Sequence, residues 1–216
     1  MTNRFYLACF RDCVGNNVSF HCKDGKGYST NIDKAHVFTL QEAQHEWETG
    51  REFDQPISAD IVDSLARWCV DSQYIPTKSD LTDPSDRYVA YQKGMWDGND
   101  VYWLNTEALE IHTDFSKASI IGKEQAQRIE HSYISVPFHL ADNVKRRTFD
   151  KRLFNLQQMV LDQGLKKPAA ASKKKKPNSG KTRFNCPSCG RFKFQFDPHQ
   201  FHGCTNIECK EWSITA

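Results

Sequence analysis

The chain has 216 residues and a formal net charge of +2, with 38% hydrophobic and 26% charged residues. This composition permits a buried core under a highly polar surface, and the length suits one or two domains with a small appendage. We expect no transmembrane helix and no secretory signal, because no run of about 18 apolar residues is present and the first residues lack a cleavage site. We therefore expect a cytoplasmic protein whose eight cysteines are thiols or metal ligands.

Charge is unevenly divided along the chain. Residues 1–165 hold 18 Lys and Arg against 24 Asp and Glu, a net charge of −6, whereas residues 166–216 hold 11 against 3, a net charge of +8. Any general attraction to nucleic acid is therefore expected in the last quarter of the chain. The acidic body is expected to repel phosphate.

Two stretches of the segment 1–165 resemble each other. Tyr6-Leu7-Ala8 is similar to Tyr88-Val89-Ala90 at an offset of 82, and the other matching blocks recur at an offset of 83, so a single insertion accounts for the difference. A segment that starts at Pro56 parallels one that starts at Pro137. We interpret these ordered matches as an internal duplication rather than as chance similarity of two polar segments. The blocks with the longer offset begin at Gly15, Thr30 and Glu42.

Each unit is predicted to begin with a small antiparallel sheet. Gly-Asn pairs tolerate positive φ and mark hairpin turns, and the segments around them are rich in β-branched and aromatic residues. The predicted strands span residues 4–10, 18–22 and 28–30 in the first unit, and residues 87–92, 101–104 and 111–113 in the second.

Helices are predicted to follow the strands in each unit. Thr39, with Glu42 three residues later, has the pattern of a capping box and starts the first helix. Gly122 takes the place of this cap in the second unit. Apolar residues at helical spacing predict a further helix over residues 59–70, with a longer counterpart over residues 141–164. Each unit is therefore expected to be a sheet with helices packed on it, an α+β fold.

The body offers few chemical motifs. It has no Gly-x-Ser-x-Gly, no phosphate-binding Gly-rich loop and no paired-carboxylate signature. We interpret Asp60 and Asp63, and likewise Asp97 and Asp100, as solvated faces rather than metal ligands. The order of its motifs resembles small modules of phage and plasmid proteins, a resemblance that implies no activity. Three cysteines of the first unit lie close in sequence to a histidine: Cys9, Cys13, His21 and Cys22. We interpret these cysteines as buried structural thiols, and the alternative is a second metal site.

The segment 166–183 differs sharply from the body. It has eight positive charges and no acidic or aromatic residue, so it cannot bury enough apolar surface to fold. We expect a flexible tether whose lysines attract phosphate; the alternative is a linker that only confers solubility. The candidate nucleic-acid contacts here are Lys173, Lys174, Lys175, Lys176, Lys181 and Arg183.

Two cysteine pairs close the chain. Cys186 and Cys189 enclose two residues, Cys204 and Cys209 enclose four, and 14 residues separate the pairs. Two such knuckles brought together by a hairpin supply the four sulfurs of a tetrahedral Zn²⁺ site; free thiols or two disulfides are the alternatives. The module resembles the four-cysteine zinc ribbons at the C-terminus of type IA DNA topoisomerases. That resemblance implies zinc ligation by these four residues and binding of single-stranded DNA.

Aromatic residues alternate between the cysteine pairs. A strand over residues 192–196 would place three phenylalanines on one face, and Lys193 and Gln195 on the other. Exposed aromatic rings flanked by positive charge act as stacking platforms for unpaired bases, at about 1–3 kcal/mol each. The alternative is that the phenylalanines form the small core of the ribbon. The candidate contacts are Arg191, Phe192, Lys193, Phe194 and Phe196.

Together these patterns predict a non-enzymatic protein. We expect the ribbon to contact single-stranded DNA while the acidic body binds an unidentified protein partner, with no membrane contact. One alternative is a phage or mobile-element inhibitor or adaptor that docks on a host nucleic-acid machine by protein contacts, and another is a nucleic-acid enzyme such as a nuclease. The predicted domains are two repeat units over residues 1–76 and 84–165, a basic linker over 166–183 and a zinc ribbon over 184–216.

Overall fold

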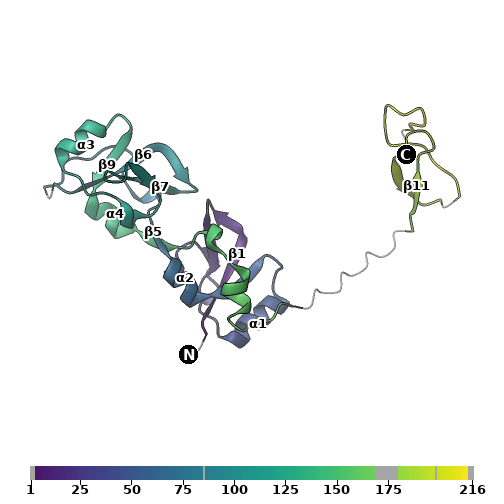
Figure 1. The fold of residues 1–216 in the computed structure, drawn as a ribbon, viewed down its shortest axis with the longest axis horizontal. Coiled ribbons are helices and arrows are strands. Elements are labelled where there is room, and N and C mark those ends of the chain that lie inside the picture. The colour runs from purple at the N-terminus through teal and green to yellow at the C-terminus, as the bar shows by residue number, and fades with distance from the viewer. Residues whose placement is uncertain (1–2, 85, 169–179, 198, 214–216) are drawn as a thin grey trace. The chain divides into compact units, whose positions relative to one another are not determined.

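The computed structural model describes residues 3–84, 86–168, 180–197 and 199–213 (Figure 1). It contains two compact units, Met1–Lys167 and Pro168–Ala216, which we call the body and the ribbon unit. The expected α+β class is confirmed: the described residues of the body form two four-stranded antiparallel sheets and one two-stranded antiparallel sheet, with short helices packed on them. None of the described helices combines the length and the apolar character needed to cross a membrane.

The two four-stranded sheets of the body have the same strand order. One runs β3-β2-β1-β4 and the other β8-β7-β6-β9, and all neighbours are antiparallel. The three strands predicted for each unit are confirmed, and β4 and β9 are additional. The strands are β1 (Phe5–Val14), β2 (Asn17–His21), β3 (Tyr28–Ser29), β4 (Asp54–Ser58), β6 (Tyr88–Asp97), β7 (Asp100–Asn105), β8 (Glu110–His112) and β9 (Tyr133–Pro137).

The strand register corrects the expected alignment of the two halves of the body, the first of which contains β1–β4 and the second β6–β9. Phe5 pairs with Ser58, and Tyr88 pairs with Pro137. Phe5 therefore corresponds to Tyr88 at an offset of 83, so the predicted offset of 82 followed by an insertion is wrong. Ser58 corresponds to Pro137, so the predicted match of Pro56 with Pro137 is also wrong. The first of these errors is a slip of one residue, which preserves a few letter matches but turns side chains to the opposite face of the strand.

The first helix of each half is capped differently: nearby residues cap it in the first half, and a residue distant in sequence caps it in the second. Helix α1 (Leu40–Thr49) begins with the predicted capping box between Thr39 and Glu42. Helix α3 (Lys123–Ile129) has Gly122 at its N-cap, which offers no side chain. Asp86 supplies the missing acceptor, because its Oδ1 accepts a hydrogen bond from the backbone N–H of Lys123 at 2.7 Å.

The two longer predicted helices are wrong in extent. Helix α2 (Ala59–Leu65) and helix α4 (Phe138–Val144) are short, and each is followed by a strand, β5 (Arg67–Cys69) or β10 (Arg146–Thr148). These two strands pair with each other and join the halves. Helical spacing of apolar residues reports only local amphipathicity, whereas this pairing is decided by a partner far along the chain. The remaining helical turns are η1 (Lys23–Gly25), η2 (Ile32–Lys34), η3 (Ser72–Tyr74), η4 (Phe115–Lys117), η5 (Lys151–Leu153) and the π-helical η6 (Gln157–Leu161).

The segments that follow β5 and β10 are exchanged between the halves. The backbone N–H of Val101 donates to the carbonyl of Val70 at 3.1 Å, and that of Val18 donates to the carbonyl of Phe149 at 3.0 Å. Val70 is buried in the core of the second half, and Phe149 in the core of the first. In Figure 1 the green end of the body accordingly lies beside the purple β1. Each half thus completes the core of the other.

Buried polar groups occupy the junction between the halves. Asp97 and Asp100 are 7% and 0% exposed, so their interpretation as a solvated face is wrong. The side chain of Asn17, also fully buried, donates to Asp100 Oδ2 at 2.7 Å. Burial raises the pKa of Asp100 above its ordinary value, and the neighbouring Arg146 opposes that shift.

Two arginines at corresponding positions of β5 and β10 balance these carboxylates. Arg67 Nη1 lies 3.0 Å from Asp150 Oδ2, and its Nη2 donates to Asn17 Oδ1 at 3.2 Å. Arg146 Nη2 lies 2.7 Å from Asp100 Oδ1. Both arginine side chains are mostly buried. Loss of Arg146 would leave the buried Asp100 without a cation, whereas Asp150 would keep its pairing with Arg152.

The ribbon unit has one small sheet. Strands β11 (Thr182–Asn185) and β12 (Phe192–Gln195) form an antiparallel hairpin, in which Arg183 lies opposite Phe194. Three cysteines and the ring of Phe201 form its buried cluster. This hairpin carries the first cysteine pair and the alternating phenylalanines.

Candidate metal centre and nucleic-acid interface

The first cysteine knuckle connects the two strands of the hairpin. The backbone N–H of Cys186 donates to the carbonyl of Arg191 at 2.7 Å, and the N–H of Gly190 donates back to the carbonyl of Cys186 at 2.9 Å. Gly190 has φ of 72°, a left-handed conformation that glycine adopts at little cost. The turn brings the side chain of Cys189 next to that of Cys186.

The second knuckle closes in a similar way. The backbone N–H of Cys209 donates to the carbonyl of Asn206 at 2.9 Å, and the N–H of Cys204 donates to the carbonyl of Glu211 at 2.6 Å. Gly203 has φ of 98°, and a Cβ at this position would lie 2.5 Å from Cβ of Ser213. A side chain at position 203 would therefore distort the knuckle.

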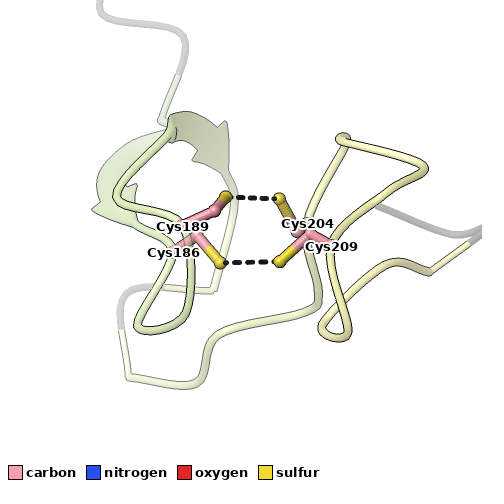
Figure 2. Close-up of side chains that lie close together, drawn as sticks. All are labelled: Cys186, Cys189, Cys204 and Cys209. Carbon is pink, nitrogen blue, oxygen red and sulfur yellow. Dashed lines mark hydrogen bonds between the residues drawn. The ribbon is translucent and has the colours of Figure 1, made fainter.

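The two knuckles face each other and bring four sulfurs together. Cys186 Sγ lies 3.6 Å from Cys209 Sγ, and Cys189 Sγ lies 3.5 Å from Cys204 Sγ (Figure 2). All four sulfurs lie within 4.8 Å of one another, a spacing that can hold a metal ion. A tetrahedral ion with metal–sulfur bonds of about 2.3 Å places its sulfurs about 3.8 Å apart. None of the eight cysteines is in a disulfide, so the alternative of two disulfides does not hold.

The pKa values of the thiols indicate that all four can ionise together only when a cation lies between them. The backbone N–H of Arg191 lowers the pKa of Cys189 to about 7, and the neighbouring thiols assist. The backbone N–H of Glu211 also favours the thiolate of Cys209, but burial and the three other thiols raise the pKa of Cys209 to about 12. Four thiolates therefore need a positive ion between them, and metal binding is expected to release protons.

The described part of the chain holds no second group of three or more His, Cys, Asp or Glu side chains that could bind a metal. Cys9 is fully buried in β1, where its Sγ donates to Asp12 Oδ2 at 3.3 Å. Burial raises the pKa of this thiol. These observations support the interpretation of Cys9 as a structural thiol.

Three phenylalanines of the ribbon unit point into solvent. Phe192, Phe194 and Phe196 keep 59%, 55% and 69% of their surface exposed, whereas Lys193 and Gln195 keep only 9% and 6%. The predicted alternation is therefore present. The alternative, in which the phenylalanines form the core of the ribbon, does not hold.

Two cations lie over the outer rings. The Arg183 guanidinium carbon is 4.7 Å from the centre of the Phe192 ring, and the Lys181 ammonium is 4.9 Å from the centre of the Phe196 ring. The rings of Phe192 and Phe194 meet edge to face at 5.9 Å. We call these five residues the aromatic face.

The opposite side of β12 holds polar groups where a core would be expected. Gln195 Oε1 accepts a hydrogen bond from the backbone N–H of His202 at 3.1 Å, and its Nε2 donates to the carbonyl of Asp197 at 2.9 Å. The Lys193 ammonium lies 5.8 Å from the centre of the Phe201 ring. Lys193 thus points away from the aromatic face. Strand alternation predicted Gln195 on this side of β12, whereas no sequence pattern indicated that Phe201 would pack there.

The other candidate contacts lie elsewhere. Arg191 is exposed at the end of the first knuckle, next to β12. The four consecutive lysines over residues 173–176 lie outside the described residues.

Comparisons with known proteins found no matching family model, no similar curated protein and no similar solved structure. The resemblance to topoisomerase ribbons therefore depends on the cysteine pattern and its immediate neighbours. The resemblance of the body to phage and plasmid modules gains no support.

Proposed function

We propose that the ribbon unit is a zinc ribbon that binds single-stranded DNA on its aromatic face. The observation that carries this proposal is the outward position of Phe192, Phe194 and Phe196 beside Lys181 and Arg183 on a two-stranded sheet. Zn²⁺ would hold the hairpin through four thiolates. Because four protein ligands fill a tetrahedral site, no position is left for a substrate, which favours a structural rather than a catalytic metal.

The spacing of the rings selects unpaired bases. The ring centres of Phe192 and Phe194 lie 5.9 Å apart, well beyond the rise of about 3.4 Å per nucleotide in a stacked strand. Adjacent rings can therefore accept successive bases only from an extended strand whose bases are unstacked. Such stacking tolerates any base sequence, while Arg183 and Lys181 supply positive charge for the phosphates.

The second part of the proposal is that the body contacts a protein partner. Its support is the net charge of −6 over residues 1–165, which disfavours general attraction of phosphate. In this proposal the protein is an adaptor without catalytic activity of its own.

Fluorescence anisotropy with a labelled oligothymidylate tests the DNA-binding role. Phe194→Ala is expected to weaken binding by about 5- to 150-fold, the equivalent of about 1–3 kcal/mol for one stacked base. Leu109→Ala, which removes an 85% exposed apolar side chain from the body, is the matched control and is expected to change nothing. Equal affinity of wild type and Phe194→Ala would overturn the proposal, and it would favour a protein-contact role for the ribbon unit.

A further inference from the structure

The first half of the body carries a basic hollow in spite of the acidic charge of the body as a whole. A hollow of about 560 Å³ lies beside β3 and the loop that precedes it. Three lysines and one tyrosine contribute to its wall, and we call these four residues the basic hollow: Lys23, Lys26, Tyr28 and Lys34.

The positive charge of the hollow is only partly neutralised. Asp24 pairs with Lys26 at 3.5 Å, and the other carboxylate of the wall, Asp33, lies 3.0 Å from Arg147. Among the described residues, neither Lys23 nor Lys34 has a carboxylate within 4.0 Å. Two exposed ammonium groups are therefore available to a negatively charged ligand.

Aromatic rings and arginines continue the surface on one side. The Arg51 guanidinium carbon lies 5.2 Å from the centre of the Tyr28 ring and 4.6 Å from that of Phe53, and Arg11 lies 3.9 Å from Phe53. Tyr28 itself is 40% exposed. The stacked guanidinium groups hold the rings in place and leave Tyr28 on the wall of the hollow.

The surface also continues toward the junction of the halves. A second hollow of about 290 Å³ shares Tyr28 and Lys34 with the first, and adds Tyr74 and Arg146 together with the carboxylate of Asp71. Tyr74 is 66% exposed. Two tyrosines and three lysines thus lie along one continuous surface, while Arg146 is already paired with Asp100.

Comparison of the two halves shows that the fold does not require Lys23 or Tyr28, whereas Lys34 has a lysine, Lys117, at the corresponding position. The strand register aligns Tyr28 with Ile111, and the same offset aligns Lys23 with Thr106 in the second half. Arg11 likewise corresponds to a glycine, Gly94. Since the second half forms the same sheet without them, Lys23 and Tyr28 are free to serve binding in the first half.

We infer that the basic hollow is a second contact site for single-stranded nucleic acid, in addition to the aromatic face. This inference builds on the proposed function of the ribbon unit. Lys23 and Lys34 would contact phosphates while Tyr28 and Tyr74 stack on bases, the combination that binds single strands without sequence preference. A strand long enough to reach both sites binds more tightly than either site alone, because the second contact becomes intramolecular.

The test uses the full-length protein and a triple variant, Lys23→Thr, Tyr28→Ile and Lys34→Gln. The first two changes introduce residues that the second half carries at the corresponding positions, so the fold is expected to tolerate them; thermal unfolding checks this. With an oligothymidylate of about 30 nucleotides, the triple variant is expected to bind at least about tenfold more weakly than wild type. Its dependence of log K on log salt is expected to be less steep by about 1.4, for two lost phosphate contacts.

A variant with the same loss of two lysines serves as the control. Lys117→Gln with Lys123→Gln removes two exposed lysines from the second half and is expected to leave affinity within twofold of wild type. The inference is overturned when the triple variant binds the strand as tightly as this control, or when wild type binds no single strand.

The two proposals can fail separately. In a Phe192→Ala and Phe194→Ala background, residual binding is expected to persist and to disappear when the triple variant is added. Weakening by the triple variant without any effect of Phe194→Ala would overturn the role of the ribbon unit and leave that of the hollow. Weakening by Phe194→Ala alone would do the reverse.

Discussion

The body and the ribbon unit bury different kinds of side chain. The body encloses large apolar residues such as Trp103, Phe5 and Phe20, each with no exposed surface. The ribbon unit encloses three cysteines, together with Lys193 and Gln195, and turns Phe192, Phe194 and Phe196 outward. Burial of apolar area can stabilise the body on its own, whereas a module as small as the ribbon unit is expected to need metal–sulfur bonds to fold. Because these three aromatic rings do not form part of a core, they are available for binding.

Metal removal is expected to reveal the largest difference in stability between the two units. A zinc chelator should unfold the ribbon unit completely, because structural Zn²⁺ contributes about 10–16 kcal/mol in comparable modules, and it should leave the body folded. Cys204→Ser should act in the same way. Two-dimensional amide NMR spectra report both units at once; ribbon signals that stay dispersed after chelation would contradict the comparison.

Truncation of the exchanged core residue is expected to destabilise only the body. Phe149→Ala should lower the free energy of unfolding by about 3–5 kcal/mol, because the fully buried ring fills the core of the opposite half. Urea denaturation followed by tryptophan fluorescence measures this change. Since the halves complete each other, both are expected to lose stability together. Unfolding of the first half alone would show that they are independent.

Acid is expected to act on the units in a defined order. Burial raises the pKa of Asp54, but the hydrogen bond from Arg51 and the neighbouring His21 outweigh it and hold that pKa below its ordinary value. The contribution of Asp54 to stability is therefore present above about pH 4 and is lost as the pH falls further. Cysteine ligands take up protons more readily, so the ribbon unit should release its metal at a higher pH.

A zinc-sensitive dye and circular dichroism, recorded over the same acid titration, establish this order. Asp54→Asn should reduce the loss of body stability between about pH 4 and pH 2. Metal release only after the body has unfolded would contradict the expectation.

The smallest effect is expected from substitution of an exposed phenylalanine of the ribbon unit. Phe194→Ala should leave the apparent zinc affinity of the ribbon unit within about twofold, or about 0.5 kcal/mol, because surface substitutions cost little and this ring is 55% exposed. Phe201→Ala, which removes the ring packed on the cysteines, should weaken zinc binding measurably. Competition with a chromophoric chelator measures both. A larger loss of zinc affinity in Phe194→Ala would show that this ring has a structural role.

Features specified by near neighbours could be predicted from the sequence. The capping box of Thr39 and Glu42 and the hairpin turns at Gly15 and Gly98 form from residues a few positions apart. The four cysteines that meet at the candidate metal centre were identified in the same way, because short knuckles fix each pair. Strand alternation likewise placed the phenylalanines on one face.

Features that depend on distant partners were decided only by the tertiary structure. The residues after Leu65 and Val144 have helical spacing, yet they form paired strands because each strand finds the other across the junction. Asp97 and Asp100 look like surface residues in a turn until the first half, through Asn16 and Asn17, packs against them. The basic hollow gathers Lys23 and Lys34 around β3 within a chain segment that is acidic on average. Local sequence fixes turns, caps and alternation, whereas burial and charge pairing depend on which distant segments meet.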